Sequence, residues 1–175
     1  MLADSSTGGR YARARIGADG SPLASTPVTD ALYLPDGDQF ISTALTRGPW
    51  SPHSQHGGPP SALLIRAAEQ IAGHHTMTAR ATIEILRPIP VAALEVEARM
   101  LRPGRKVQMI GATLTADGSE IARLTSLHVR RNDELELPPP LHDVAAPPPP
   151  TEGTEVHALN VGYESFAGDA LEVRY

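Results

Sequence analysis

Residues 57–73 read GGPPSALLIRAAEQIAG, and residues 78–85 read TARATIEI. The first stretch predicts a helix and the second a strand. The two prolines fall in the first helical turn, where backbone N–H groups have no helical partner and proline is tolerated. Apolar residues then recur three and four positions apart on one face, at Leu64, Ala67, Ala68, Ile71 and Ala72. Gly73 is a typical helix end. In the strand, one face carries Ala79, Ala81, Ile83 and Ile85, and the other Thr78, Arg80, Thr82 and Glu84.

The rest of the central region consists of strand patterns joined by turn signals. The further strands are predicted at residues 39–45, 94–100, 107–116 and 121–131. Ala116-Asp117-Gly118 is a strong turn signal, and a slip in the apolar phase near Gly111 predicts a bulge. One helix against a largely antiparallel sheet places the fold in the α+β class.

Composition excludes several classes of protein. The chain has 175 residues, which suits one domain with a sizeable core. It has no cysteine, so disulfides, thiolate metal sites and a cysteine nucleophile are excluded. The net charge of −5 argues against nucleic acid as a partner, and no apolar run is long enough for a membrane span. The N-terminus lacks a secretory signal pattern, so we expect a cytoplasmic protein.

Charge and proline are unevenly distributed along the chain. Residues 78–131 carry nine basic and five acidic side chains, and residues 132–175 carry one and nine. The basic region could meet an anionic ligand, or could be a strand face balanced by an acidic tail. We predict a flexible arm at 1–29, the main domain at 30–132, a proline-rich linker at 133–155 and the start of a second unit at 156–175. Residues 162–166 and 170–175 have strand-like patterns.

Chemistry-bearing residues gather just before the helix. The stretch from Gly48 to Leu64 holds the only tryptophan, Trp50, two histidines and a glycine pair. Because prolines donate no hydrogen bond, the amides of Gly57, Gly58 and Ser61 are the ones that remain available at the positive end of the helix. Such amides can stabilise a developing oxyanion. The alternative is a helix cap with a glycine turn.

Residues 56–64, HGGPPSALL, preceded by 47–50, RGPW, resemble the first half of double hotdog acyl-CoA thioesterases of the thioesterase II-like group. Residues 87–90, RPIP, and 102–108, RPGRKVQ, match the same pattern. The resemblance implies a hotdog fold, a curved antiparallel sheet wrapped around one central helix, in residues 30–132. Residues 156–175 would begin a second, truncated hotdog. The implied activity is hydrolysis of acyl-CoA to a free acid and coenzyme A, with acyl-CoA as partner and no cofactor.

The resemblance also implies roles for residues. We expect His56, Gly57 and Gly58 to be catalytic, and the substrate to be bound by Trp50, Pro59, Ser61, Leu64, Arg105 and Lys106. Single-hotdog relatives carry an acid on the helix seven to nine residues after the histidine, where this chain has Leu63, Leu64 and Ile65. The only helix acid, Glu69, lies about 16 Å beyond Gly58 and is predicted to be too far to share its site. The family's catalytic Asp, hydroxyl residue and Gln belong to the second hotdog.

Other interpretations remain open. The chain could be a non-catalytic acyl-CoA-binding or assembly module, or a hydratase, although no Asp partner for His56 is evident. Ser61 with His56 could form a nucleophilic pair, and no metal is expected at His53 and His56 or at His74 and His75. Trp50 could be a packing anchor, and the hairpin-tip basic residues could simply be solvated. An open sheet edge predicts a homo-oligomer or pairing with a second hotdog half.

Overall fold

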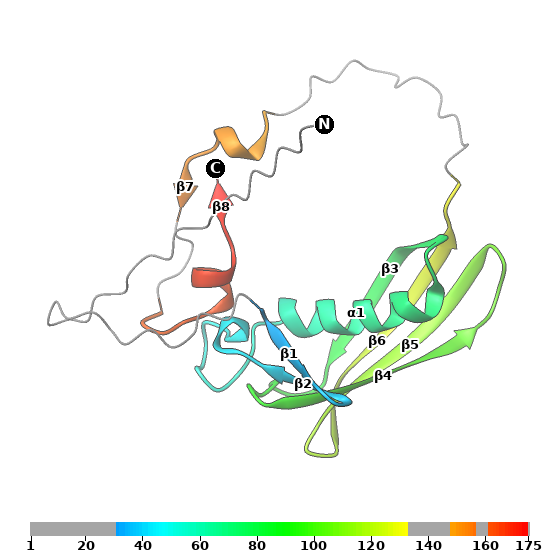
Figure 1. The fold of residues 1–175 in the computed structure, drawn as a ribbon, viewed down its shortest axis with the longest axis horizontal. Coiled ribbons are helices and arrows are strands. Elements are labelled where there is room, and N and C mark those ends of the chain that lie inside the picture. The colour runs from blue at the N-terminus through cyan, green and yellow to red at the C-terminus, as the bar shows by residue number, and fades with distance from the viewer. Residues whose placement is uncertain (1–30, 133–147, 157–160, 175) are drawn as a thin grey trace, which may run out of the picture. The chain divides into compact units, whose positions relative to one another are not determined.

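One helix crosses a six-stranded sheet in the computed structural model, which describes residues 31–132, 148–156 and 161–174 (Figure 1). The main elements are β1 (Tyr33–Asp36), β2 (Gln39–Ser42), α1 (Gly58–Ala72), β3 (Thr76–Ile85), β4 (Ala93–Arg102), β5 (Val107–Ala116) and β6 (Ser119–Arg130). A short 3-10 helix, η1 (Ala44–Thr46), replaces the end of the strand predicted at 39–45. The predicted arm at 1–29 and residues 133–147 of the predicted linker lie outside the described residues.

The sheet is antiparallel throughout, in the order β1-β2-β4-β5-β6-β3. The curved sheet wraps α1, which packs mainly on β4, β5 and β6 (Figure 1). This confirms the predicted α+β class with one central helix. In the described part of the chain, no helix has the length and apolarity needed to cross a membrane.

The core lies between α1 and the inner face of the sheet. Pro59 and Pro60 occupy the first helical turn, and the Gly73 N–H closes the last turn by donating to the carbonyl oxygen of Glu69, 3.1 Å away. Leu64 and Ala68 are fully buried, as the apolar spacing predicted. They pack with inner-face residues of the sheet, chiefly Leu94, Ile110, Leu114, Ala122 and Leu124.

Turns and bulges set the register. Asp117 and Gly118 both have positive φ, 48° and 70°, the geometry of the tight hairpin turn that this pair favours. The irregularity predicted near Gly111 lies on the neighbouring strand: Gly111 itself pairs regularly with Arg99 and Thr125, and the register shifts between Met100 and Arg102 of β4, where Leu101 is an extra residue. A larger residue would not fit at position 111, because the Leu101 side chain lies over Gly111 and its Cδ1 atom is 3.1 Å from the place that a Cβ would take.

A bulge at Ala79 changes the face of the preceding residue. The register passes from Thr78 opposite His128 to Arg80 opposite Leu127, so Ala79 is an extra residue. The sequence pattern predicted Thr78 on the face away from the core. Its hydroxyl in fact contacts α1, because the extra residue shifts the alternation by one position.

The segment after the proline-rich stretch matches the prediction in part, since β8 (Val173–Arg174) lies within the strand predicted at 170–175. Residues 162–166, predicted as a strand, lead into a short helical turn, η3 (Phe166–Ala170). The Ser165 hydroxyl accepts from the Gly168 N–H, and its own N–H donates to an Asp169 carboxylate oxygen. These local bonds satisfy the backbone without a sheet. The remaining elements are η2 (Pro150–Glu152) and a two-stranded pair, β7 (Glu155–Val156) with β8 (Val173–Arg174).

Candidate functional site

The loop before α1 is fixed by buried hydrogen bonds. The Gln55 side chain donates to the carbonyl oxygen of Pro90 at 2.7 Å and accepts from the Tyr33 hydroxyl at 2.6 Å. Burial raises the pKa of Tyr33 well above its ordinary value, so the phenol remains a donor. The backbone N–H of His56 donates to Thr46 O at 2.7 Å. The loop therefore presents its glycine pair from a rigid base.

Local hydrogen bonds occupy two of the three amides predicted to be available. The Gly58 N–H donates to Nδ1 of His56 at 3.0 Å, and the Ser61 N–H donates to the Gly57 carbonyl oxygen at 3.3 Å. The Ser61 hydroxyl donates to the same oxygen at 2.6 Å, which leaves it poorly suited to act as a nucleophile. Within the described residues, only the Gly57 N–H of these three lacks a partner. Because Nδ1 accepts, the proton of the neutral His56 ring lies on Nε2.

Three rings stack beside this turn. His56 lies between Trp50, at a centroid distance of 6.1 Å, and Phe166 of η3, at 5.0 Å. The tail is held there because the Phe166 N–H donates to the Arg47 carbonyl oxygen at 2.9 Å. A Cβ on Gly58 would lie 3.1 Å from the Phe166 ring, so this glycine permits the close approach. Trp50 is 79% exposed. The sequence carried no signal that Phe166 would reach this site.

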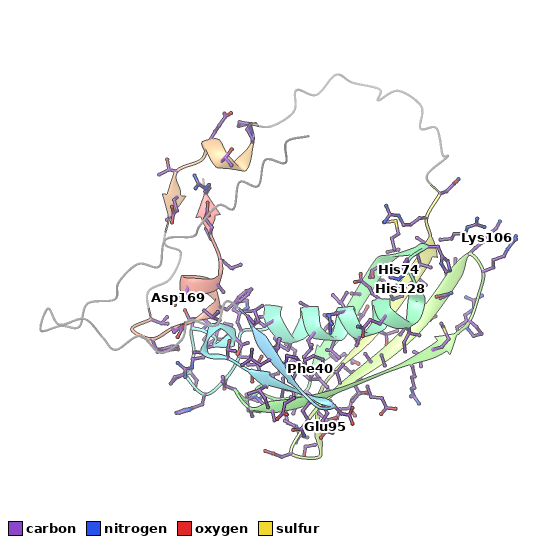
Figure 2. All side chains as sticks on the ribbon, viewed as in Figure 1. Phe40, His74, Glu95, Lys106, His128 and Asp169 are labelled. Carbon is purple, nitrogen blue, oxygen red and sulfur yellow. The ribbon has the colours of Figure 1, made fainter. Side chains whose placement is uncertain are left out.

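The remaining predicted substrate residues do not gather at the turn. Pro59 and Leu64 are buried in the core. Arg105 and Lys106 are exposed in the turn between β4 and β5, and the Lys106 carbonyl oxygen accepts from Arg130 N–H at the far end of β6. Figure 2 shows Lys106 at the end of the domain where His74 follows α1. The 15 residues of α1 separate the two groups by about 22 Å.

A second polar cluster lies near the C-terminal end of α1. The Thr78 hydroxyl donates to Oε1 of Glu69 at 2.9 Å, and Thr78 Oγ1 lies 3.5 Å from Nδ1 of His128. Nε2 of His128 lies 2.8 Å from the hydroxyl oxygen of Ser126. Both His128 and Ser126 are 1% exposed, whereas Glu69 reaches solvent. The structure thus gives Glu69 partners that its position in the sequence did not suggest.

The electrostatics of this cluster favour a neutral imidazole. Burial lowers the pKa of His128, and the nearby Glu69 carboxylate opposes that shift to a smaller extent. Gln108 lies opposite His128 in the register of β5 and β6. Its Oε1 atom is buried and has no hydrogen-bond partner in the described part of the chain. The cluster therefore combines a carboxylate, a hydroxyl and a neutral imidazole next to an unsatisfied acceptor.

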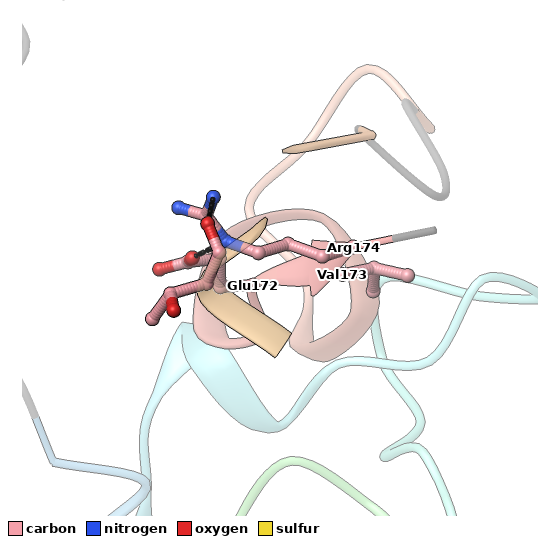
Figure 3. A pocket seen from close by; sticks show the side chains of 4 residues that line it. Glu172, Val173 and Arg174 are labelled. Atoms are coloured by element: carbon pink, nitrogen blue, oxygen red, sulfur yellow. Dashed lines mark hydrogen bonds and ion pairs between the residues drawn. The ribbon is translucent and has the colours of Figure 1, made fainter. Parts of the chain in front are cut away.

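Two surface hollows are weaker candidates. One, of about 380 Å³, lies in the tail, lined by Thr151, Glu172, Val173 and Arg174 (Figure 3). There Arg174 pairs with Glu172 and donates to the Thr151 carbonyl oxygen, so its charge is already satisfied. The other, of about 410 Å³, lies on the outer sheet face, where Arg123 pairs with neighbouring carboxylates. Among the described residues, no group of three or more metal-ligating side chains forms a site.

Comparison with known proteins agrees with this architecture. Residues 46–129 match the family model of the acyl-CoA thioesterase N-terminal domain. A search of curated proteins finds no match. Three solved structures are similar in fold. A proposed thioesterase II from Thermobifida fusca YX is 21% identical, with a TM-score of 0.55, over 75% of this chain and 47% of that one.

The two other structures show the same fold. A hot dog protein of unknown function from Alicyclobacillus acidocaldarius is 21% identical, with a TM-score of 0.53, over 75% of this chain and 49% of that one. The E. coli PaaI protein from the phenylacetic acid degradation operon is 19% identical, with a TM-score of 0.50, over 54% of this chain and 70% of that one. This chain thus spans about half the length of the first two structures. Together the three structures establish the hotdog fold.

Proposed function

We propose that this chain binds acyl-CoA and takes part in its hydrolysis to a free acid and coenzyme A, because residues 46–129 match the family model of the acyl-CoA thioesterase N-terminal domain. In this proposal the chain is the N-terminal of two hotdog halves. Hydrolysis of a thioester by water needs no redox cofactor, and none is proposed.

The observation that carries this proposal is the Gly57 N–H at the start of α1, which has no partner among the residues that the structure describes. A thioester carbonyl oxygen placed there would accept from this amide and from Nε2–H of His56, at the positive end of the helix dipole. The space above Gly57 is open, since a Cβ there would meet only Ile85 Cδ1, at 3.6 Å. The apolar side chain of Ile85, half exposed on β3, suits contact with an acyl group.

A second hotdog unit would complete the site. β3 is an edge strand, and Met77 and Ile85 on it are 53% and 51% exposed. Such an edge favours pairing with another strand. An antiparallel partner strand would bring the end of that unit's α1 next to the Gly57 turn of this chain. If the second unit is another copy of this chain, its Arg105 and Lys106 would then approach the phosphates of coenzyme A.

A non-catalytic hotdog that only binds acyl-CoA is the second candidate. It is favoured by Phe166, which packs on Gly58 and covers one side of the turn. Under this alternative, acyl-CoA binds without release of thiol.

The test is thiol release from a panel of acyl-CoA esters, followed with a thiol-reactive dye. The protein has no cysteine and contributes no background. Gly57 has φ −64°, which proline can adopt, so Gly57→Pro removes the N–H with little other change. Gly57→Ala keeps the N–H and is the matched control. We expect Gly57→Pro to lower kcat by about 10²–10³ relative to Gly57→Ala.

Equal rates for the two variants would show that this amide is not used. Binding of a non-hydrolysable acyl-CoA thioether without any thiol release would establish the non-catalytic alternative. Light scattering at micromolar concentration tests the pairing, and a sharp monomer that still turns over acyl-CoA would contradict it.

A further inference from the structure

The cluster at the far end of α1 has the parts of a general base, and it deepens the function proposed above. We infer that Glu69 is a general base for hydrolysis in this chain, held in position by a hydrogen-bonded chain through Thr78, His128 and Ser126. The family resemblance placed the acid in the second hotdog, so this assignment gives the first half its own base.

The proton count in the cluster sets one direction for its hydrogen bonds. Thr78 has a single hydroxyl proton, which it donates to Oε1 of Glu69 at 2.9 Å. Therefore Nδ1 of His128 must be the donor in its longer contact with Thr78 Oγ1. In a neutral imidazole, Nε2 is then the acceptor from the Ser126 hydroxyl at 2.8 Å, which is shorter than the alternative bond from Ser126 to Ile110 O, at 3.2 Å. Every donor points toward the carboxylate.

This direction leaves one carboxylate oxygen available. Oε1 of Glu69 accepts from Thr78, whereas Oε2 has no partner within the described residues and the side chain is exposed. A water molecule can bind to Oε2 while Thr78 prevents the carboxylate from rotating. The interior end of the chain is anchored, because His128 and Ser126 are both 1% exposed and bonded to each other.

The proposed step balances in atoms and electrons. Oε2 of Glu69 takes a proton from water as the water oxygen forms a bond to the carbonyl carbon of the ester or thioester. Collapse of the tetrahedral intermediate breaks the bond from carbon to sulfur in a thioester, or from carbon to the phenolic oxygen in an aryl ester, and the leaving thiolate or phenolate takes the proton back from Glu69. Glu69 is the catalytic residue, and Thr78, His128 and Ser126 are positioning residues.

The carbonyl that reacts at Glu69 is not held by Gly57 of the same copy. Eleven residues of helix separate Gly58 from Glu69, about 16 Å. The two ends act on one substrate only if a second unit pairs with β3 in the antiparallel sense. The base can nevertheless be tested by itself, with a small activated ester that needs no binding of coenzyme A.

The experiment compares the full chain with Glu69→Gln, which removes the base but keeps the shape and the bond from Thr78. Glu97→Gln, an exposed acid on the outer face of β4, is the matched control. Thr78→Val removes the hydroxyl, and Thr78→Ser restores it. Two substrates are used, an acyl-CoA ester and p-nitrophenyl acetate, and circular dichroism checks the fold of each variant.

We expect Glu69→Gln to lower kcat by at least 10² on both substrates, with Glu97→Gln unchanged. Thr78→Val should lower kcat about tenfold with little change in KM, and Thr78→Ser should recover most of that loss. A merely structural role for the hydroxyl would leave kcat intact in the folded variant.

The outcomes separate this inference from the proposed function. If Glu69→Gln changes the rate of acyl-CoA hydrolysis by less than twofold, Glu69 is not the general base, and the proposed thioesterase activity still stands. If hydrolysis of p-nitrophenyl acetate depends on Glu69 but acyl-CoA is not hydrolysed, the role of Glu69 as a base is supported and the proposed thioesterase activity is refuted. A wild-type protein that accelerates neither reaction overturns both.

Discussion

Replacement of Ser126 and His128, singly and together, should reveal how strongly the buried end of the cluster is coupled. Ser126→Ala removes the hydroxyl that bonds Nε2 of His128, in surroundings where both side chains are 1% exposed. A buried polar atom left without its partner costs about 1–3 kcal/mol, and here Nε2 of His128 is left without the donor that it has in the wild type. We therefore expect Ser126→Ala to lower the free energy of unfolding by about 1–3 kcal/mol.

The second single variant and the double variant complete the cycle. His128→Leu keeps a side chain of similar size and removes the imidazole, and Ser126 can still donate to Ile110 O. We expect this change to cost about 1–2 kcal/mol. In the double variant no imidazole remains unsatisfied, so its loss should be smaller than the sum of the two single losses by about 1–2 kcal/mol.

The assay is urea unfolding of all four proteins at pH 7.5, followed by circular dichroism, with equal m-values required for the comparison. Losses that add within about 0.3 kcal/mol would refute the reasoning. In that case the contact between Ser126 and His128 would not hold the base in place, and the chain of donors would have no anchored end.

The remaining predictions concern stability and can be measured in the same way. Because burial lowers the pKa of His128, the unfolded chain gains a proton first as pH falls through about 6.5, so stability should decline there, and this decline should be absent in His128→Leu. Phe166→Ala should cost about 1 kcal/mol through loss of its stacking on His56, and thermal melts would detect it. Leu64→Ala should cost about 3 kcal/mol in urea, since Leu64 is fully buried. Gly104→Ala should destabilise the turn between β4 and β5 and lower the melting temperature, since its Cβ would lie 2.2 Å from the first carbonyl oxygen of β5.

Local patterns were sufficient to predict most of the fold. Apolar spacing and first-turn prolines gave α1, and alternation gave the long strands, because these signals report burial of one face. The turn at Asp117 and Gly118 followed from the positive φ that this pair tolerates. Errors arose where the cause was distant in sequence. The pattern around Gly111 predicts a bulge in β5, whereas the extra residue is Leu101 of β4, because nothing in the sequence of β5 shows which strand carries the irregularity or that Leu101 covers Gly111.

The site was harder to predict than the fold. Thr78 contacts Glu69 nine residues before it and His128 fifty residues after it, and neither distance forms a motif. Tyr163 reaches the Gly48 carbonyl oxygen across 115 residues in the same way. The glycine turn was found because its residues are contiguous, but the bonds that occupy two of its amides depend on side-chain directions that spacing does not report.

The extra residue in β3 shifts the alternation of side chains between the two faces of the strand by one position. On the N-terminal side of Ala79, odd-numbered and even-numbered residues exchange faces. Because of this exchange, Thr78 and Ile83, which are five residues apart, lie on the same face of the sheet, the one that α1 covers. Deletion of Ala79 would preserve nearly all of the composition and hydropathy of the strand, yet it would turn the hydroxyl toward solvent and away from Glu69. Among related sequences, the presence or absence of one alanine could therefore separate chains that carry a base in this half from chains that do not.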